Sequence, residues 1–449
     1  MSLLAALALL AAPPAILPRD CPAPLAAAQA RCGTVSVAED RARPDGRRIA
    51  LNMVILPSVG PVRHPPLVSL EGGPGLPAVP GAVFYLTDGA AYRAGRDIVL
   101  FDQRGTGQSN PLDCPDLTAP DIQYLLAYPV DRVRACREAL SGRADLRHYG
   151  TDTAAADLDE VRRALGAERI DIVALSYGTL LAQRYMTLYP GRTRAAVLFG
   201  VAPPEARPPR SHAPAAQAAF DQLFAACAAA PACAGLVRDW RATLASALAR
   251  LPADLPGEVF TEKLRSLAYA PTGARAIPLI LSRAAAGDFG PFYARTRRSG
   301  PLPDAEGMYL SITCSEGLAA MDVGEAAAAS RATVFGDYRL RRQQAACAEW
   351  PLYEVASGFF TPAAPDAALL IVSGELDPVT PPAWAEALAR RAPRARHLVL
   401  PGSGHVFDGM SGIDTCLDPL VVRFLDSGDV AALDAGCVAA MRPPAFATE

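Results

Sequence analysis

The segment "RIDIVALSYGTLLAQRYMTLYP" (169–190) decides the fold that we expect for this chain of 449 residues. Its first part, 169–175, is a short, mainly apolar run that predicts a buried strand. Its second part, 177–190, has the apolar spacing of a helix. Only Ser176 separates the two parts. A buried strand that passes directly into a helix is typical of a parallel sheet covered by helices.

The same alternation of strand and helix extends to both sides of this segment, and glycine-rich loops follow two of the predicted strands. This pattern predicts an α/β fold with a mainly parallel, doubly wound sheet. Further strands are expected at 48–56, within 66–75, within 96–109, and at 194–201, 367–375 and 396–402; further helices are expected at 151–166, at 382–392 and after Asp414.

The alternation stops between residues 203 and 365, where alanine-rich helical segments predominate. Strand and helix alternate again after this stretch, so it does not form a separate downstream domain. We expect a helical cap over 203–365, inserted into a core that is formed by 21–202 and 366–449.

The first twenty residues contain an apolar run of about ten residues, followed by small residues and prolines. This length suits a signal peptide and is too short to span a bilayer. We predict a signal peptide at 1–20 and no stable membrane insertion, although the usual Lys or Arg ahead of the run is missing. The alternative is an N-terminal helix that packs on the domain.

Ten cysteines support export. An even number in an exported chain predicts disulfides, but the spacing leaves their connectivity open. The alternative is a set of free, buried thiols in a cytosolic enzyme. Together with the N-terminal segment, the cysteines predict a periplasmic or secreted protein. Abundant alanine, proline and arginine with very little lysine fit a GC-rich bacterial genome. The cysteines form five sequential pairs of near neighbours, 21/32, 114/136, 227/233, 314/347 and 416/437.

The composition argues against several classes of partner. The formal net charge is only −3, and no run of Lys or Arg provides a surface for nucleic acid. No CxxC or Cys/His cluster has the spacing of a zinc site. We expect no nucleic-acid partner, no metal and no organic cofactor.

Three residues occur in the order that a serine nucleophile, its orienting acid and its histidine base require. Ser176 lies at the strand-to-helix turn, Asp377 follows the strand 367–375, and His405 follows the strand 396–402. Each alone has an ordinary explanation as a surface serine, a turn former or a structural histidine. Because parallel strands end at one edge of the sheet, together they predict a catalytic triad.

The reaction also needs donors for the negative charge that develops on the carbonyl oxygen. The sequence "EGGPG" (71–75) follows a predicted strand, and its alternative interpretation is a simple turn. We expect the backbone amides of Gly73 and Tyr177 to form the oxyanion hole. Pro74 is excluded because it has no N–H group.

Five motifs occur in this order along the chain: "EGGPG", "DQRGTGQS", "ALSYGT", "GELDPVTPP" and "GSGHV". Together they resemble the proline iminopeptidases and tripeptidyl aminopeptidases, which are capped serine peptidases of the α/β-hydrolase superfamily. The resemblance covers the chain from about residue 30 to the C-terminus and is weakest in the cap. It implies an α/β-hydrolase fold in which Asp102 and Arg104 hold the "DQRGTGQS" loop and Ser109 is not the nucleophile.

The chain departs from the pattern of that group at three places. Ala174 replaces the first glycine of the G-x-S-x-G turn, Glu71 stands where proline iminopeptidases have histidine, and "LPA" follows "GGPG" where a further glycine is usual. Alanine adds only one methyl group, so Ser176 remains the expected nucleophile. The departures bear on substrate preference more than on catalysis.

The resemblance also implies that a carboxylate of the cap holds the free α-ammonium group of the substrate. Glu316 in "SITCSEG" is the first candidate, because a Cys314–Cys347 bridge could fix this turn over the pocket. Glu306 and Glu349 are weaker candidates. The alternative for each is an ordinary solvated glutamate.

The sequence thus predicts an exported serine hydrolase, most simply an aminopeptidase that releases N-terminal residues or short peptides through an acyl-enzyme on Ser176. Its partner is then a peptide substrate. One alternative keeps the triad but acts as an esterase or amidase on small molecules, since only the cap separates the two chemistries. Another is a catalytically inactive binding protein, against which all three competent triad residues argue.

Overall fold

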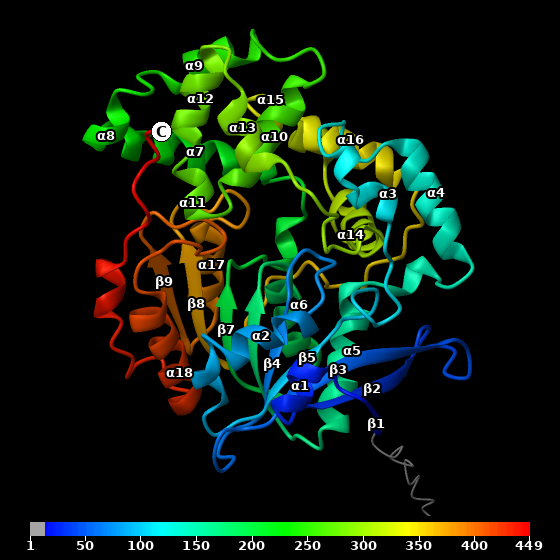
Figure 1. The fold of residues 1–449 in the computed structure, drawn as a ribbon. Coiled ribbons are helices and arrows are strands. Elements are labelled where there is room, and N and C mark those ends of the chain that lie inside the picture. Colours follow the sequence, from blue (N-terminus) through cyan, green and yellow to red (C-terminus); the bar gives the residue numbers. More distant parts are fainter. Residues whose placement is uncertain (1–13) are drawn as a thin grey trace, which may run out of the picture.

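The computed structural model describes residues 14–449, and its centre is one nine-stranded sheet (Figure 1). The strand order is β1-β2-β3-β5-β4-β6-β7-β8-β9. Strands β4 to β9 are parallel, whereas β1, β2, β3 and β5 form antiparallel pairs with their neighbours in that order. The bounds are β1 Ile16–Arg19, β2 Arg31–Ala38, β3 Arg48–Leu56, β4 Leu67–Leu70, β5 Ile98–Phe101, β6 Ile170–Leu175, β7 Thr193–Phe199, β8 Ala368–Gly374 and β9 Ala395–Leu400.

Helices cover both faces of this sheet, which confirms the prediction of a doubly wound, mainly parallel sheet. Side chains of neighbouring residues in the central strands point to opposite faces of the sheet, and each face has its own apolar cluster. In β7, for example, Ala196 packs in the cluster on one face and Val197 in the cluster on the other. This explains why the strands are continuous apolar runs in the sequence. One face packs against α5 (Thr151–Ala164), α6 (Tyr177–Leu188) and α17 (Pro382–Arg391), and the other against α2 (Ala82–Leu86) and α18 (Asp418–Ser427).

The sequence pattern does not predict the two antiparallel strands β1 and β2 at the end of the sheet. β1 has only four residues, three of them exposed, and β2 is the segment "RCGTVSVA", which has few bulky side chains. β1 lies inside the segment 1–20 for which we predict a signal peptide. Residues 1–13, which hold the apolar run of that segment, lie outside the described residues.

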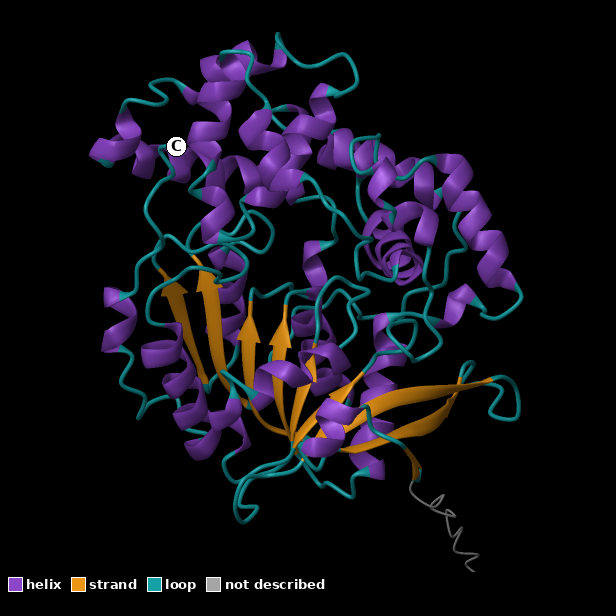
Figure 2. Ribbon diagram, in the orientation of Figure 1, coloured by secondary structure: helices purple, strands orange, loops and turns teal. Residues whose placement is uncertain are grey.

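Between β7 and β8 the described chain forms helices and no strand, and these helices lie beyond the carboxyl ends of the strands (Figure 2). Many of them share an apolar core, in which the rings of Phe224 and Trp240 stack 5.1 Å apart. Phe446 near the C-terminus also packs in this core. The main helices of the segment are α7 His212–Ala229, α9 Trp240–Leu248, α10 Gly257–Leu267, α12 Ile277–Ala285, α13 Gly290–Thr296, α14 Glu306–Ile312, α15 Val323–Arg331 and α16 Tyr338–Cys347, with shorter ones at α8 Pro231–Ala234 and α11 Pro271–Ala274.

Two helices from the first half of the chain lie beside this helical segment. They are α3 (Pro115–Thr118) and α4 (Val130–Ser141), which lie next to α14 and α16 in Figure 1. Arg137 of α4 donates a hydrogen bond of 2.8 Å to the carbonyl oxygen of Glu349. The helical layer is therefore built from two separate stretches of the sequence.

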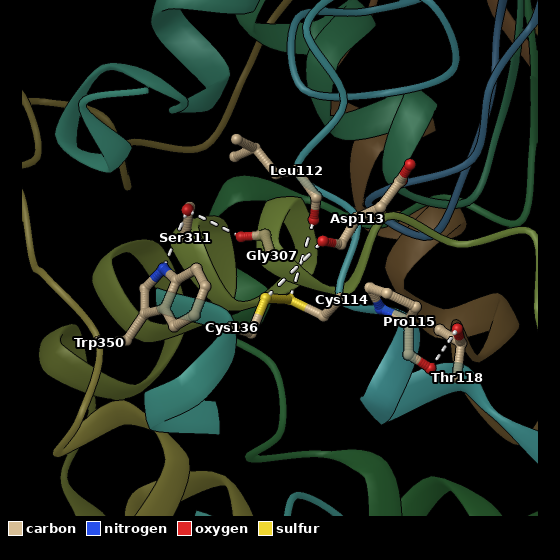
Figure 3. The surroundings of a disulfide bond; sticks show 9 residues. All are labelled: Leu112, Asp113, Cys114, Pro115, Thr118, Cys136, Gly307, Ser311 and Trp350. Carbon is tan, nitrogen blue, oxygen red and sulfur yellow. Dashed lines mark hydrogen bonds between the residues drawn. A yellow bond between two sulfur atoms is a disulfide. The ribbon is translucent and has the colours of Figure 1, made fainter. Parts of the chain in front are cut away.

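The ten cysteines form five disulfides, and each joins sequential neighbours. The Cys114–Cys136 bridge closes the chain between α3 and α4 beside α14 (Figure 3). In the same place, Ser311 of α14 accepts a hydrogen bond of 3.0 Å from the indole nitrogen of Trp350. Five disulfides are typical of proteins from an oxidising compartment outside the cytoplasm.

No helix within residues 14–449 is long and apolar enough to cross a membrane.

Candidate active site

A cavity of about 560 Å³ lies between the carboxyl ends of the parallel strands and the helices of the 203–365 segment. Ser176 follows β6, His405 follows β9, and the loop 72–75 follows β4. All three line the cavity, together with Glu306 and Glu316 from the helical segment. The parallel sheet thus brings together residues that are far apart in the sequence.

Ser176 lies in the sharp turn between β6 and α6, with a φ of +55°. This conformation is strained for any residue with a side chain, and it presents the serine at the edge of the sheet. A side chain at Gly178 would lie 2.2 Å from the carbonyl oxygen of Leu70, so the turn requires glycine there. Ala174 is fully buried and pairs with Leu70 and Leu198, so its methyl group fits within the sheet.

Asp377 and His405 are buried and joined by a hydrogen bond of 2.7 Å between Oδ2 of the carboxylate and Nδ1 of the imidazole. The other carboxylate oxygen, Oδ1, accepts hydrogen bonds from the backbone amides of Val379 and Thr380, at 2.8 and 2.9 Å. These contacts fix the carboxylate, and the carboxylate in turn orients the ring so that Nε2 remains available. The ring of Tyr269 contacts His405 edge-on, with 5.3 Å between the ring centres.

Sequence reasoning missed Thr380 as a member of this group. Its hydroxyl oxygen lies 2.7 Å from Oδ2 of Asp377 and 3.0 Å from Nδ1 of His405. A threonine three residues after an aspartate in a proline-rich turn commonly closes such a turn with its own side chain, which is the signal that could have indicated it.

The loop after β4 lies directly against the serine. A side chain at Gly72 would come within 2.9 Å of Cβ of Ser176, and Gly73 has a φ of +104° that favours glycine. Tyr177 is the first residue of α6, so its backbone N–H is among those that a helix leaves without an internal partner. The two amides expected to form the oxyanion hole therefore belong to residues that line the same cavity as Ser176.

The "DQRGTGQS" loop is held by buried polar contacts. Arg104 makes two hydrogen bonds to the carboxylate of Asp157, at 2.6 and 2.7 Å. Asp102 accepts hydrogen bonds from Asn52 and from the backbone of Val79 and Gln108. Ser109 is buried and donates to the carbonyl oxygen of Asp102 at 2.7 Å. These contacts confirm that Asp102 and Arg104 hold the loop.

Glu316 lies in a single turn of π-helix, Thr313–Gly317, and its carboxylate is buried at the cavity wall. It accepts hydrogen bonds from the backbone N–H and the hydroxyl of Thr151, at 2.7 and 2.6 Å, and from the hydroxyl of Tyr353 at 2.7 Å. Burial raises its pKa to about 7, and the hydrogen bonds from Thr151 and Tyr353 offset part of this effect. The Thr151 hydroxyl also contacts the hydroxyl of Tyr177 at 2.9 Å. Glu316 is thus already well supplied with protein donors.

Glu306, the first residue of α14, has fewer hydrogen-bond donors than Glu316. It lines the same cavity, and its Oε2 is buried without a hydrogen-bond partner among residues 14–449. Burial, and then the charge of the nearby Asp304, raise its pKa to about 7, and the charge of Arg339 and a hydrogen bond with the Tyr128 side chain offset part of this effect. The backbone N–H of Ala305 donates to the carbonyl oxygen of Gly75 at 3.1 Å. This contact places the acidic pair, Asp304 and Glu306, beside the loop that holds Gly73.

The remaining glutamate candidate and the cavity's arginines have other partners. Glu349 does not line the cavity and pairs at the surface with Arg134 and Arg137. Arg339 lines the cavity near Glu306, but its guanidinium pairs with Glu262 at 3.2 Å. Arg265 makes two hydrogen bonds to the same Glu262. The two arginines share the single carboxylate of Glu262, so one positive charge remains in this group. The charge of Arg339 lowers the pKa of Glu306, but Arg339 makes no hydrogen bond to Oε2 of Glu306.

The chain is similar to one protein family and to several curated proteins. The model of the α/β-hydrolase fold family matches residues 65–407. The chain is 25% identical over 413 residues to YuaR of Escherichia coli K12, which covers 84% of this chain and 80% of YuaR. It is 32% identical over 225 residues to serine protease Hip1 of Mycobacterium tuberculosis, which covers 45% of this chain and 42% of Hip1.

The chain is also 32% identical over 196 residues to a tripeptidyl aminopeptidase of Streptomyces coelicolor. This alignment covers 39% of the chain and 35% of that enzyme. The chain therefore spans less than half the length of each of these two curated peptidases.

Proposed function

The chain belongs to the α/β-hydrolase fold family, and we propose that it is an exported serine aminopeptidase. The partial similarity to Hip1 and to a tripeptidyl aminopeptidase supports a peptide substrate. The five disulfides support a periplasmic or secreted location. The observation that carries the aminopeptidase assignment is the buried, unpartnered carboxylate oxygen of Glu306 in the cavity that Ser176 also lines.

In the proposed reaction, Oγ of Ser176 attacks the scissile carbonyl carbon while Nε2 of His405 takes the hydroxyl proton. Asp377 holds the ring through Nδ1 and stabilises the imidazolium that forms. The amides of Gly73 and Tyr177 bind the oxyanion. His405 then gives its proton to the leaving amine, and a water molecule hydrolyses the acyl-enzyme by the same steps in reverse.

The free N-terminus of the substrate supplies the hydrogen-bond donor that Oε2 of Glu306 lacks. An α-ammonium group carries three N–H donors and a positive charge, so it satisfies the buried oxygen and compensates its charge. Asp304 adds negative charge at the same place. In this proposal Glu316 either shares the ammonium group or holds Thr151 and Tyr177 in position, and variants of the two glutamates separate these roles.

Incubation of the enzyme with a library of peptides, analysed by mass spectrometry, tests the proposal. We expect residues or short peptides to be released only from free N-termini. Internal cleavage, or hydrolysis of small esters with no cleavage of any peptide, would contradict the aminopeptidase assignment and favour an endopeptidase or the esterase alternative.

Glu306→Gln removes the proposed ammonium acceptor and keeps the shape of the side chain. We expect KM for a peptide with a free N-terminus to rise about 10- to 100-fold, which corresponds to a hydrogen bond to a charged group, with kcat little changed. Glu349→Gln is the matched control, because Glu349 lies outside the cavity, and its KM should not change. A larger rise in KM for Glu316→Gln than for Glu306→Gln would assign the ammonium site to Glu316 instead.

If the carboxylate of Glu306 binds the α-ammonium group, KM for a peptide with a free N-terminus must depend on pH. Below about pH 7 the carboxyl group of Glu306 is protonated, since burial raises its pKa to about 7. KM for a peptide with a free N-terminus should therefore rise by up to about tenfold per pH unit as the pH falls from 7 to 5. KM for an uncharged ester, measured over the same range, should stay flat. Equal profiles for the two substrates, or an unchanged profile in Glu306→Gln, would exclude Glu306 as the acceptor.

A further inference from the structure

A second cavity, of about 320 Å³, lies on the face of the sheet that α2 and α18 cover. Its walls are mainly apolar and come from the strand ends and from these two helices, with Phe84, Tyr85 and Phe199 among them. Leu175 and Val406 line both this cavity and the larger one. Each is the chain neighbour of a proposed catalytic residue, Ser176 or His405. The second cavity therefore lies directly behind the proposed active site.

Of the residues that the structure describes, two with carboxyl groups and no Lys, Arg or His line this second cavity. The carboxyl group of Glu71 accepts a single weak hydrogen bond, of 3.3 Å, from the hydroxyl of Ser69. Asp418 accepts one of 2.8 Å from the hydroxyl of Tyr92. Burial raises the pKa of both groups above their ordinary values. An apolar cavity with acidic groups and no cation is complementary to an apolar ligand that carries one positive charge.

We propose that this cavity binds a small primary amine with an apolar body, such as an arylalkylamine, with its ammonium group on Glu71. The body of the ligand fits between Phe84, Tyr85 and Phe199. The volume of about 320 Å³ is at the lower end of the range for small-molecule sites, so the ligand must be small. Glu71 is followed directly in the chain by Gly72, the first residue of the loop 72–75. This site is distinct from the ammonium acceptor proposed at Glu306.

Calorimetric titration with 2-phenylethylamine at pH 7.5 tests the proposal. The starting protein is the Glu306→Gln variant, because its larger cavity lacks the proposed ammonium acceptor. We expect one bound amine per chain and at least tenfold weaker binding of the neutral analogue 2-phenylethanol, on the order of a charged hydrogen bond. Adding Glu71→Gln should weaken amine binding by about tenfold or more. Adding Phe84→Ala should weaken it about fivefold through lost apolar contact.

Phe84 is partly exposed, so Phe84→Ala keeps the test valid if Glu71→Gln fails to fold. Asp408→Asn, an exposed change outside the cavity, is the matched control and should leave the affinity unchanged. The proposal is overturned if the amine and the alcohol bind equally, or if neither Glu71→Gln nor Phe84→Ala weakens binding. It is also overturned if no binding of the amine is detected up to about 10 mM, which is well above a millimolar Kd. All these readings measure binding, so they do not depend on whether the chain is an aminopeptidase.

Discussion

Ser176→Ala should lower kcat by about 10⁵-fold and abolish covalent labelling by a fluorophosphonate probe, because it removes the only nucleophile in the proposed mechanism. The residual rate reflects the oxyanion donors and substrate binding, which the substitution leaves in place. Turnover measured with an active-site-titrated wild type as reference, and labelling followed by mass spectrometry, give the two readings. Labelling that persists on another residue would remove Ser176 from its role.

The loss of activity in this variant should not come with a loss of stability. Ser176 has a φ of +55°, a backbone conformation that is as unfavourable for alanine as it is for serine. Ser176→Gly relieves that conformation, so we expect it to be equally inactive but more stable by about 1 kcal/mol in urea unfolding. A large destabilisation of either variant would mean that the serine hydroxyl supports the fold rather than the reaction.

Asp377→Asn should lower kcat by about 10³- to 10⁴-fold while KM changes little, as expected for the orienting acid of a triad. The asparagine keeps one oxygen for the amides of Val379 and Thr380, so its amide nitrogen faces Nδ1 of His405. An N–H donor at that place favours the histidine tautomer whose Nε2 carries the proton, and that tautomer cannot act as a base. Steady-state kinetics, with thermal unfolding as a check on the fold, measure this effect.

The control for this prediction is Asp408→Asn, an exposed aspartate three residues after His405. Like Asp377→Asn, this substitution removes one negative charge, here in the loop that holds His405, but it does not alter a contact of the imidazole. The value of kcat should therefore remain close to that of the wild type. If Asp377→Asn is as active as Asp408→Asn, the hydrogen bond of 2.7 Å between Asp377 and His405 has no part in the reaction.

Much of the fold could be predicted because the parallel strands are buried on both faces. Such strands are continuous apolar runs, and the residue that follows each run lies at the edge where the cavity forms. This is why the segment at Ser176 and those before Asp377 and His405 could be recognised from one sequence. The five neighbouring cysteine pairs could be recognised as well, and the structure settles their connectivity, which spacing alone leaves open.

The contacts of the helical layer could not be predicted in the same way, because packing between distant segments decides them. Glu316 is prominent in the sequence, but Thr151 and Tyr353 already supply its hydrogen bonds. Glu306 has no special sequence signal, and only the structure reveals that one of its oxygens is buried without a partner. The same holds for Glu71. The sequence shows that this residue departs from the pattern of the proline iminopeptidases, but only the structure shows that it lines a second cavity.

The most direct test of aminopeptidase activity compares two forms of the same substrate with the wild-type enzyme. Peptide nitroanilides of one to three residues, each with a free and with an acetylated N-terminus, are hydrolysed at pH 7.5, and kcat/KM is measured for each pair. We expect acetylation to lower kcat/KM by at least about tenfold for every peptide that is cleaved, since it removes the charge that Glu306 binds. Equal values for the free and acetylated forms would contradict the aminopeptidase assignment.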